Sequence, residues 1–175
     1  MINIRPAAPA DLSALLALVQ RAYRGEAARA GWTHEADLLD GQRTDADALG
    51  AALASPSERI VLAEEDEALI GCVQVTDKSA GLASLGLLSV DPARQAGGLG
   101  RRLIAAAEQA AREAFASTAV EMTVIAQRAE LIAWYERRGY VRTGERRPFP
   151  LDDPRFGLPR THDLAFVVLC KTLAG

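Results

Sequence analysis

The stretch that decides the fold is Gln95-Ala96-Gly97-Gly98-Leu99-Gly100-Arg101-Arg102. It follows an apolar run at residues 85–90, and an amphipathic pattern that begins within it continues to about Phe115. A strand, a glycine-rich turn and a helix N-terminus in this order are typical of an anion site. Glycine lets the backbone approach a ligand, and the first N–H groups of a helix have no partner within the helix. The stretch therefore predicts a site for a phosphate-bearing cofactor.

Spacing separates three kinds of phosphate-binding loop. A mononucleotide phosphate loop carries Lys and then Ser or Thr after its last glycine, where this chain has two arginines. A dinucleotide-binding fold carries a third glycine where this chain has Leu103. The remaining pattern is Gln/Arg-x-x-Gly-x-Gly, which Gln95, Gly98 and Gly100 satisfy. Taken alone, this short pattern is equally compatible with a plain glycine turn.

The rest of the chain alternates strand and helix patterns. We expect strands at residues 2–5, 60–63, 69–76, 82–90, 120–125, 140–143 and 165–171. We expect helices at residues 9–23, 46–54, 98–115 and 129–138, the last one ended by Gly139 in a left-handed cap. Residues 25–41 read as irregular or weakly helical, and residues 146–163 as a long loop stiffened by four prolines.

The composition is typical of a soluble globular protein, since 49% of the 175 residues are hydrophobic and 25% are charged. We expect a single domain over residues 1–175. The net charge of −3 gives no reason to propose nucleic acid or a membrane as a partner. No apolar stretch is long enough to span a bilayer and no signal peptide is evident, so we expect a cytoplasmic protein. Cys72 and Cys170 are then expected to be free, buried thiols.

A second motif occupies residues 131–140 and reads Leu-Ile-Ala-Trp-Tyr-Glu-Arg-Arg-Gly-Tyr. Together with the glycine motif and the order of elements, it resembles the GNAT superfamily of acyl-CoA-dependent N-acetyltransferases over nearly the whole chain. The resemblance implies an α/β (α+β) fold. Its central sheet would be mixed but mostly antiparallel, with six to seven strands splayed between the fourth and fifth, flanked by about four helices. It further implies acetyl-CoA as co-substrate and the primary amine of a small molecule or peptide as acceptor.

The resemblance also assigns roles to individual residues. Tyr135 would lie beside the thioester sulfur and act as a general acid, because a neutral phenol can protonate a leaving thiolate. Leu88 and Val90 would bind pantetheine through their backbones, as an added strand binds a sheet edge. The backbone amides expected to hold the pyrophosphate are those of Gln95, Ala96, Gly97, Gly98, Leu99, Gly100 and Arg101. The side chains that could bind the 3′-phosphate are those of Arg94, Arg101 and Arg102.

The chain departs from the family pattern at three positions. Ala96 stands where many relatives carry glycine, and Gly97 stands where a basic residue is common. Arg128 occupies the position at which many members place an asparagine near pantetheine, so that contact is not transferred to this chain.

The acceptor side carries weaker signals. A base must deprotonate the amine, and Glu121 and Glu35 are the candidates. Residues 26–47 hold six acids against two arginines, which fits either attraction of a cationic amine or a solvated helix pair. The isolated histidines, His34 and His162, predict no metal site. The resemblance to the family, together with the proline-rich loop, favours a homodimer. The alternative function is a non-catalytic acyl-CoA sensor or interaction module, against which Tyr135 argues, because binding alone needs no proton donor.

Overall fold

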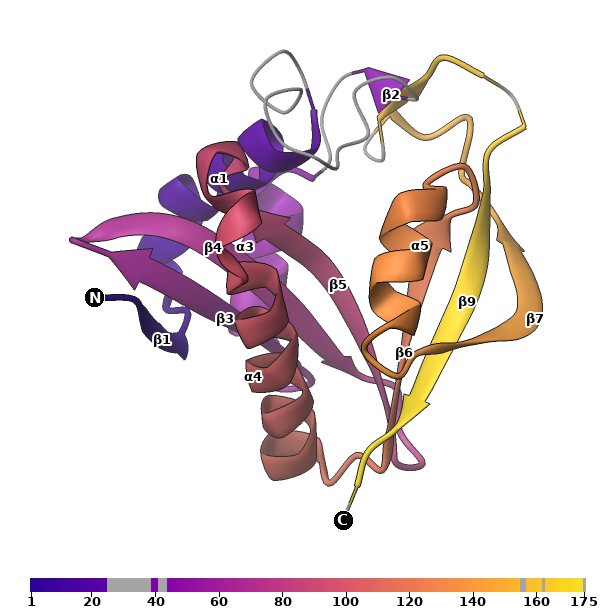
Figure 1. Ribbon diagram of the computed structural model, residues 1–175. Coiled ribbons are helices and arrows are strands. Elements are labelled where there is room, and N and C mark those ends of the chain that lie inside the picture. Colours follow the sequence, from indigo (N-terminus) through magenta and orange to yellow (C-terminus); the bar gives the residue numbers. More distant parts are fainter. Residues whose placement is uncertain (25–38, 41–43, 155–156, 162, 175) are drawn as a thin grey trace.

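The computed structural model describes residues 1–24, 39–40, 44–154, 157–161 and 163–174 (Figure 1). Its central feature is a seven-stranded sheet with the strand order β1-β3-β4-β5-β6-β9-β7. Every neighbouring pair in this sheet is antiparallel except β5 and β6, which are parallel. The strands are β1 (Asn3–Pro6), β3 (Glu58–Glu65), β4 (Ala68–Asp77), β5 (Leu82–Val90), β6 (Ala119–Ile125), β7 (Val141–Pro148) and β9 (Ala165–Thr172).

Helices cover both faces of this sheet, because successive side chains of a strand point to opposite faces. In β3, Ile60 and Leu62 pack with α1 (Leu12–Tyr23) and α3 (Ala46–Ala54). The alternate residues Val61 and Ala63 belong to a second core with α4 (Leu99–Phe115) and α5 (Ala129–Glu136). Two short 3-10 turns, η1 (Pro9–Asp11) and η2 (Pro92–Gly97), precede α1 and α4.

The sheet opens between β5 and β6. These strands pair at only three positions, the last being Ser84 with Glu121, and then diverge (Figure 1). Beyond that point β5 carries a bulge, because its register with β4 shifts between Cys72 and Gln74 and Leu87 adopts a positive φ of 51°. β5 and β6 are the fourth and fifth strands of this sheet along the chain, so the expected splay and the mixed, mostly antiparallel fold are confirmed.

The C-terminal part differs from expectation. The strand expected at residues 140–143 begins at Val141 and continues to Pro148, and the expected loop contains β8 (Leu158–Pro159). β8 pairs with β2 (Leu39–Asp40) in a separate two-stranded sheet. The strand was underestimated because β7 is an exposed edge strand, whose mostly polar residues show no apolar alternation.

Two further features of the fold concern the cysteines and the helix lengths. Both cysteines are free, as predicted, but Cys72 is buried whereas Cys170 is only half-buried. Burial raises the pKa of Cys72 to about 12. Among the described residues, no helix combines the length and the apolar character needed to cross a membrane.

Candidate active site

The N-terminus of α4 lies at the open end of the splay. Gly98 caps the helix in the left-handed conformation, with φ of 74°, which glycine adopts without a steric penalty. Leu99 packs into the core at 2% exposure and holds the first turn of α4 against the sheet. A Cβ on Gly100 would lie 3.3 Å from the Trp134 ring, so the helix and α5 approach closely here.

A first cavity, of about 200 Å³, lies between this helix end, β5 and α5. Three of the residues expected to bind cofactor do not line this cavity, namely Ala96, Gly97 and Leu99. Six do line it, namely Leu88, Val90, Gln95, Gly98, Gly100 and Arg101.

Arginine side chains dominate the charge of this first cavity. Arg101, Arg128 and Arg138 line it, and no acidic residue does so among those that the structure describes. The Arg138 guanidinium lies 3.6 Å from the centroid of the Trp134 ring and donates a hydrogen bond of 2.6 Å to the Trp134 carbonyl. Burial lowers the pKa of Arg138, with smaller contributions from Arg137 and Arg101. This arrangement favours an anionic ligand.

The other two arginines considered for the 3′-phosphate are placed differently. Arg94 forms a 2.5 Å ion pair with Glu65, and Arg102 donates to the Ile2 carbonyl at 3.5 Å. Neither lines the first cavity. Sequence reasoning missed Arg138, whose signal was its spacing of four residues from Trp134 on one helix face.

A second cavity, of about 240 Å³, occupies the splay itself, between β5, β6, the end of α1 and the segment Phe149-Pro150. The two cavities share wall residues, among them Tyr23, Leu88, Arg128 and Tyr135. The Tyr23 hydroxyl donates a hydrogen bond of 2.5 Å to the Leu88 carbonyl and so ties α1 to the bulged part of β5. The junction between the cavities is therefore built from α1, β5, α5 and the Arg128 position just before α5.

Tyr135 lies at this junction. Its side chain is largely buried, with its ring edge-on to Trp134 at a centroid distance of 5.0 Å. Burial raises the pKa of Tyr135, and the nearby Tyr23 phenol adds to the rise. Among the described residues none is hydrogen-bonded to the Tyr135 hydroxyl. The phenol is therefore protonated at neutral pH, and Tyr135 lines both cavities.

Comparison with known proteins agrees with this architecture. The family model described as the acetyltransferase (GNAT) domain matches residues 21–149, which is more than half of the chain. The chain belongs to the GNAT acetyltransferase family. The resemblance inferred from the two motifs is thereby confirmed. No curated protein matches the chain.

Solved GNAT structures share the whole fold at low sequence identity. One is yncA of Salmonella typhimurium, assigned as an acetyltransferase and solved with acetyl-CoA, at 20% identity and a TM-score of 0.71, covering 100% of this chain and 95% of that one. Another is the ribosomal-protein-S18-alanine N-acetyltransferase of Escherichia coli, at 17% identity and a TM-score of 0.72; the match covers 100% of this chain and 97% of that one. A third is a chimera of the spermidine N-acetyltransferase SpeG from Vibrio cholerae and hSSAT, at 16% identity and a TM-score of 0.70. The match covers 98% of this chain and 95% of that one.

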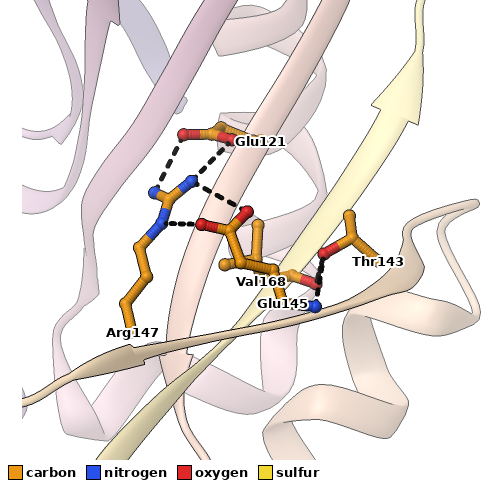
Figure 2. Close-up of polar contacts among 5 residues, drawn as sticks. All are labelled: Glu121, Thr143, Glu145, Arg147 and Val168. Carbon is orange, nitrogen blue, oxygen red and sulfur yellow. Dashed lines mark hydrogen bonds and ion pairs between the residues drawn. The ribbon is translucent and has the colours of Figure 1, made fainter.

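Of the two candidate bases of this GNAT chain, Glu121 lies among the described residues and is engaged in an ion pair. Glu121 accepts hydrogen bonds of 3.1 and 3.3 Å from Arg147, which also binds Glu145 at 2.8 Å (Figure 2). Glu121 lines neither cavity. Glu35 and the histidines His34 and His162 lie outside the described residues. Within the described part of the chain, no group of three or more His, Cys, Asp or Glu side chains could hold a metal ion.

Proposed function

We propose that this protein transfers an acetyl group from acetyl-CoA to the primary amine of a small molecule or peptide. The observation that carries the proposal is the position of Tyr135, the tyrosine of the second sequence motif, which lines both cavities. One cavity then holds the donor and the other holds the acceptor. A proton donor at their meeting point is what a transfer between them requires.

The first cavity suits coenzyme A. Its phosphates are expected at the amides of Gly98–Arg101, where a helix N-terminus and nearby arginines both favour negative charge. Its amide-rich pantetheine arm is expected along Leu88 and Val90. Beyond Ser84, β5 no longer pairs with β6, so that edge has no strand partner there, while the Leu88 and Val90 carbonyls accept hydrogen bonds from the Tyr23 and Gln95 side chains. These contacts remain the roles predicted from the sequence, now supported by the position of the cavity.

The chemistry needs a proton at the leaving sulfur. Acetyl-CoA supplies a thioester, whose carbonyl carbon forms a bond to the amine nitrogen while its C–S bond breaks. Tyr135 is proposed to give its proton to the departing sulfur, which yields the free CoA thiol and an N-acetyl amide. The proton lost by the amine returns to the phenol through solvent. Because burial keeps the phenol neutral, the donor is in the correct protonation state before transfer begins.

The deciding experiment measures thiol release from acetyl-CoA in the presence of amines. The panel contains amino acids, a polyamine and a short peptide with a free N-terminus, and the acetylated product is identified by mass spectrometry. We expect amine-dependent release with a matching N-acetyl product. Calorimetric binding of acetyl-CoA without release for any amine would instead favour the non-catalytic sensor. A cytoplasmic location and a homodimer also remain predictions, the second testable by light scattering.

A further inference from the structure

Two arginine side chains from different elements lie at the first turn of α4. Arg101 belongs to that turn, and its Nη2 atom would lie 3.9 Å from a Cβ placed on Gly98. Arg138 lies just after the end of α5, with its guanidinium 3.6 Å from the centroid of the Trp134 ring. That ring in turn would lie 3.3 Å from a Cβ on Gly100. Both guanidinium groups are therefore near the backbone amides of this turn, and both line the first cavity.

Neither arginine has a carboxylate partner among the described residues. The Arg138 side chain donates one hydrogen bond, to the Trp134 carbonyl at 2.6 Å, and its buried Nε has no hydrogen-bond partner. Arg101 makes no hydrogen bond or ion pair within the described part of the chain. The charge of Arg101 contributes, after burial and Arg137, to lowering the pKa of Arg138, so the two guanidinium groups repel each other. Positive charges gathered without a counter-charge favour an anion.

The anion that fits this place best is a diphosphate. The first N–H groups of α4 can bind one phosphate group. A diphosphate carries a second charged group directly attached to the first, and that group can reach a guanidinium beside the turn. A guanidinium has five N–H donors, and Trp134 takes one from Arg138, so a planar set of donors is left for phosphate oxygens.

We infer that Arg138 binds the diphosphate of coenzyme A together with Arg101, so that the donor is held from the α5 side as well as by α4. The inference rests on the proposed use of acetyl-CoA and assigns a further binding residue to it. The contact with the Trp134 ring holds the guanidinium in place, which lowers the entropy cost of ordering a long side chain on binding. Trp134 also packs edge-on against Tyr135, so the phosphate site and the proposed proton donor are built on one short segment.

The test compares ligands that differ in their phosphates. Dissociation constants are measured by calorimetry for CoA and for dephospho-CoA, which lacks the 3′-phosphate, and by ligand-observed NMR for pantetheine, which has no phosphate. In Arg138→Gln we expect the Kd to rise by about 10- to 100-fold for CoA and for dephospho-CoA alike, because a charge-assisted hydrogen bond is lost from each. The Kd for pantetheine should stay within about twofold, since its binding does not involve this charge.

Two outcomes would overturn the inference. Equal weakening of all three ligands would show that Arg138 acts only through the structure of the cavity. Weakening of CoA alone would mean that Arg138 contacts the 3′-phosphate and not the diphosphate. Arg138→Lys keeps the charge without the planar fork, so it should regain part of the affinity.

Arg137→Gln is the matched control. It removes the same charge from the adjacent residue, which is exposed and lines neither cavity. The Kd for CoA should change by less than about threefold in this variant, because an exposed charge is screened by solvent. A loss as large as that in Arg138→Gln would reduce the effect to net charge and contradict a specific contact.

These binding measurements need no turnover, so the inference and the proposed function fail separately. The expected pattern of Kd values without acetylation of any amine would support the phosphate site and contradict the proposed function. Acetylation of an amine with an unchanged Kd for CoA in Arg138→Gln would support the proposed function and reject the phosphate site.

Discussion

The ring of Tyr140 packs edge-on against the ring of Tyr135, with the centroids 5.9 Å apart and the planes at 70°. The Tyr140 hydroxyl donates a 2.8 Å hydrogen bond to Glu108 of α4, and Lys171 of β9 binds the same carboxylate at 2.8 and 3.0 Å. Tyr140 is thus held by Glu108, whose carboxylate is itself bound by Lys171. The Tyr140 ring in turn limits where the Tyr135 phenol can lie.

This contact predicts different effects for two substitutions of Tyr140. Tyr140→Phe keeps the ring and should reduce the free energy of unfolding by about 1 kcal/mol, with kcat little changed. Tyr140→Leu removes the ring against Tyr135 and should lower kcat about tenfold or more, because the proton donor loses its fixed position. Urea unfolding and thiol-release kinetics measure the two effects. Equal kcat values for the two variants would show that the ring contact does not position Tyr135.

Tyr135 itself is expected to affect turnover and not donor binding. Tyr135→Phe removes the only group proposed to protonate the leaving sulfur, so kcat should fall by about 10²- to 10⁴-fold. The affinity for acetyl-CoA, measured by calorimetry, should stay within about threefold, because the ring is retained and one neutral hydrogen bond is the most that is lost. An unchanged kcat would remove Tyr135 from the mechanism.

The ion pair between Glu121 and Arg147 predicts that Glu121 is not the base (Figure 2). Glu121→Gln should leave kcat and its pH profile unchanged and cost about 1 kcal/mol of stability, because the partner Arg147 is partly exposed. Arg147→Gln removes the other partner of the same ion pair. It should therefore show the same unchanged kcat and the same loss of stability as Glu121→Gln. A fall in kcat of about 10²-fold in Glu121→Gln alone would restore Glu121 as a base.

Much of the donor side could be predicted because its residues are constrained locally. Glycine adopts the left-handed conformation at a helix end without a steric penalty, so the left-handed Gly139 after α5 was predicted from the chain. Leu99 and Leu103 recur with the helical period, and both are buried against the sheet as that period predicts. Such signals depend on neighbours in sequence and need no knowledge of the rest of the fold.

The acceptor side could not be read in the same way. Tyr23 continues the apolar face of α1, so its periodicity matches that of the core leucines. Its partner, the Leu88 carbonyl, is 65 residues away. Arg24 and Arg128 carry no pattern that separates a cavity wall from a solvated surface. Only the splay of β5 from β6 brings them to one cavity, and that opening is a property of the whole sheet.

The glycines of the α4 N-terminus offer a matched pair of substitutions. Gly98→Ala places a Cβ on a residue with φ of 74°, which should cost about 1 kcal/mol of stability and weaken acetyl-CoA binding if the turn shifts. Gly97→Ala is the control, because its φ is not positive and its Cβ would meet nothing within 4 Å. Thermal unfolding and calorimetry should separate the two variants. Identical behaviour would mean that the left-handed cap is not required.

Stability should decline in alkaline solution because buried acids resist ionisation. Burial raises the pKa of Cys72 from 9.0 to about 12, and raises those of Tyr135 and Tyr140 above their ordinary value of 10.0. The unfolded chain therefore loses these protons first. The stabilising effect is fully present below pH 9 and is lost as the pH rises, by about 1.4 kcal/mol per pH unit for each group that ionises only in the unfolded chain.

Two variants assign this decline to particular groups. Cys72→Ala should flatten the fall in unfolding free energy from pH 9 upward, whereas Tyr140→Phe should flatten it only from pH 10, where an exposed phenol begins to ionise. Urea unfolding at a series of pH values measures both slopes. Because Tyr140→Phe removes a titrating proton but keeps the ring, it changes the slope without removing the contact with Tyr135. A slope equal to that of the unmodified protein would place the Tyr140 hydroxyl in contact with water and contradict its bond to Glu108.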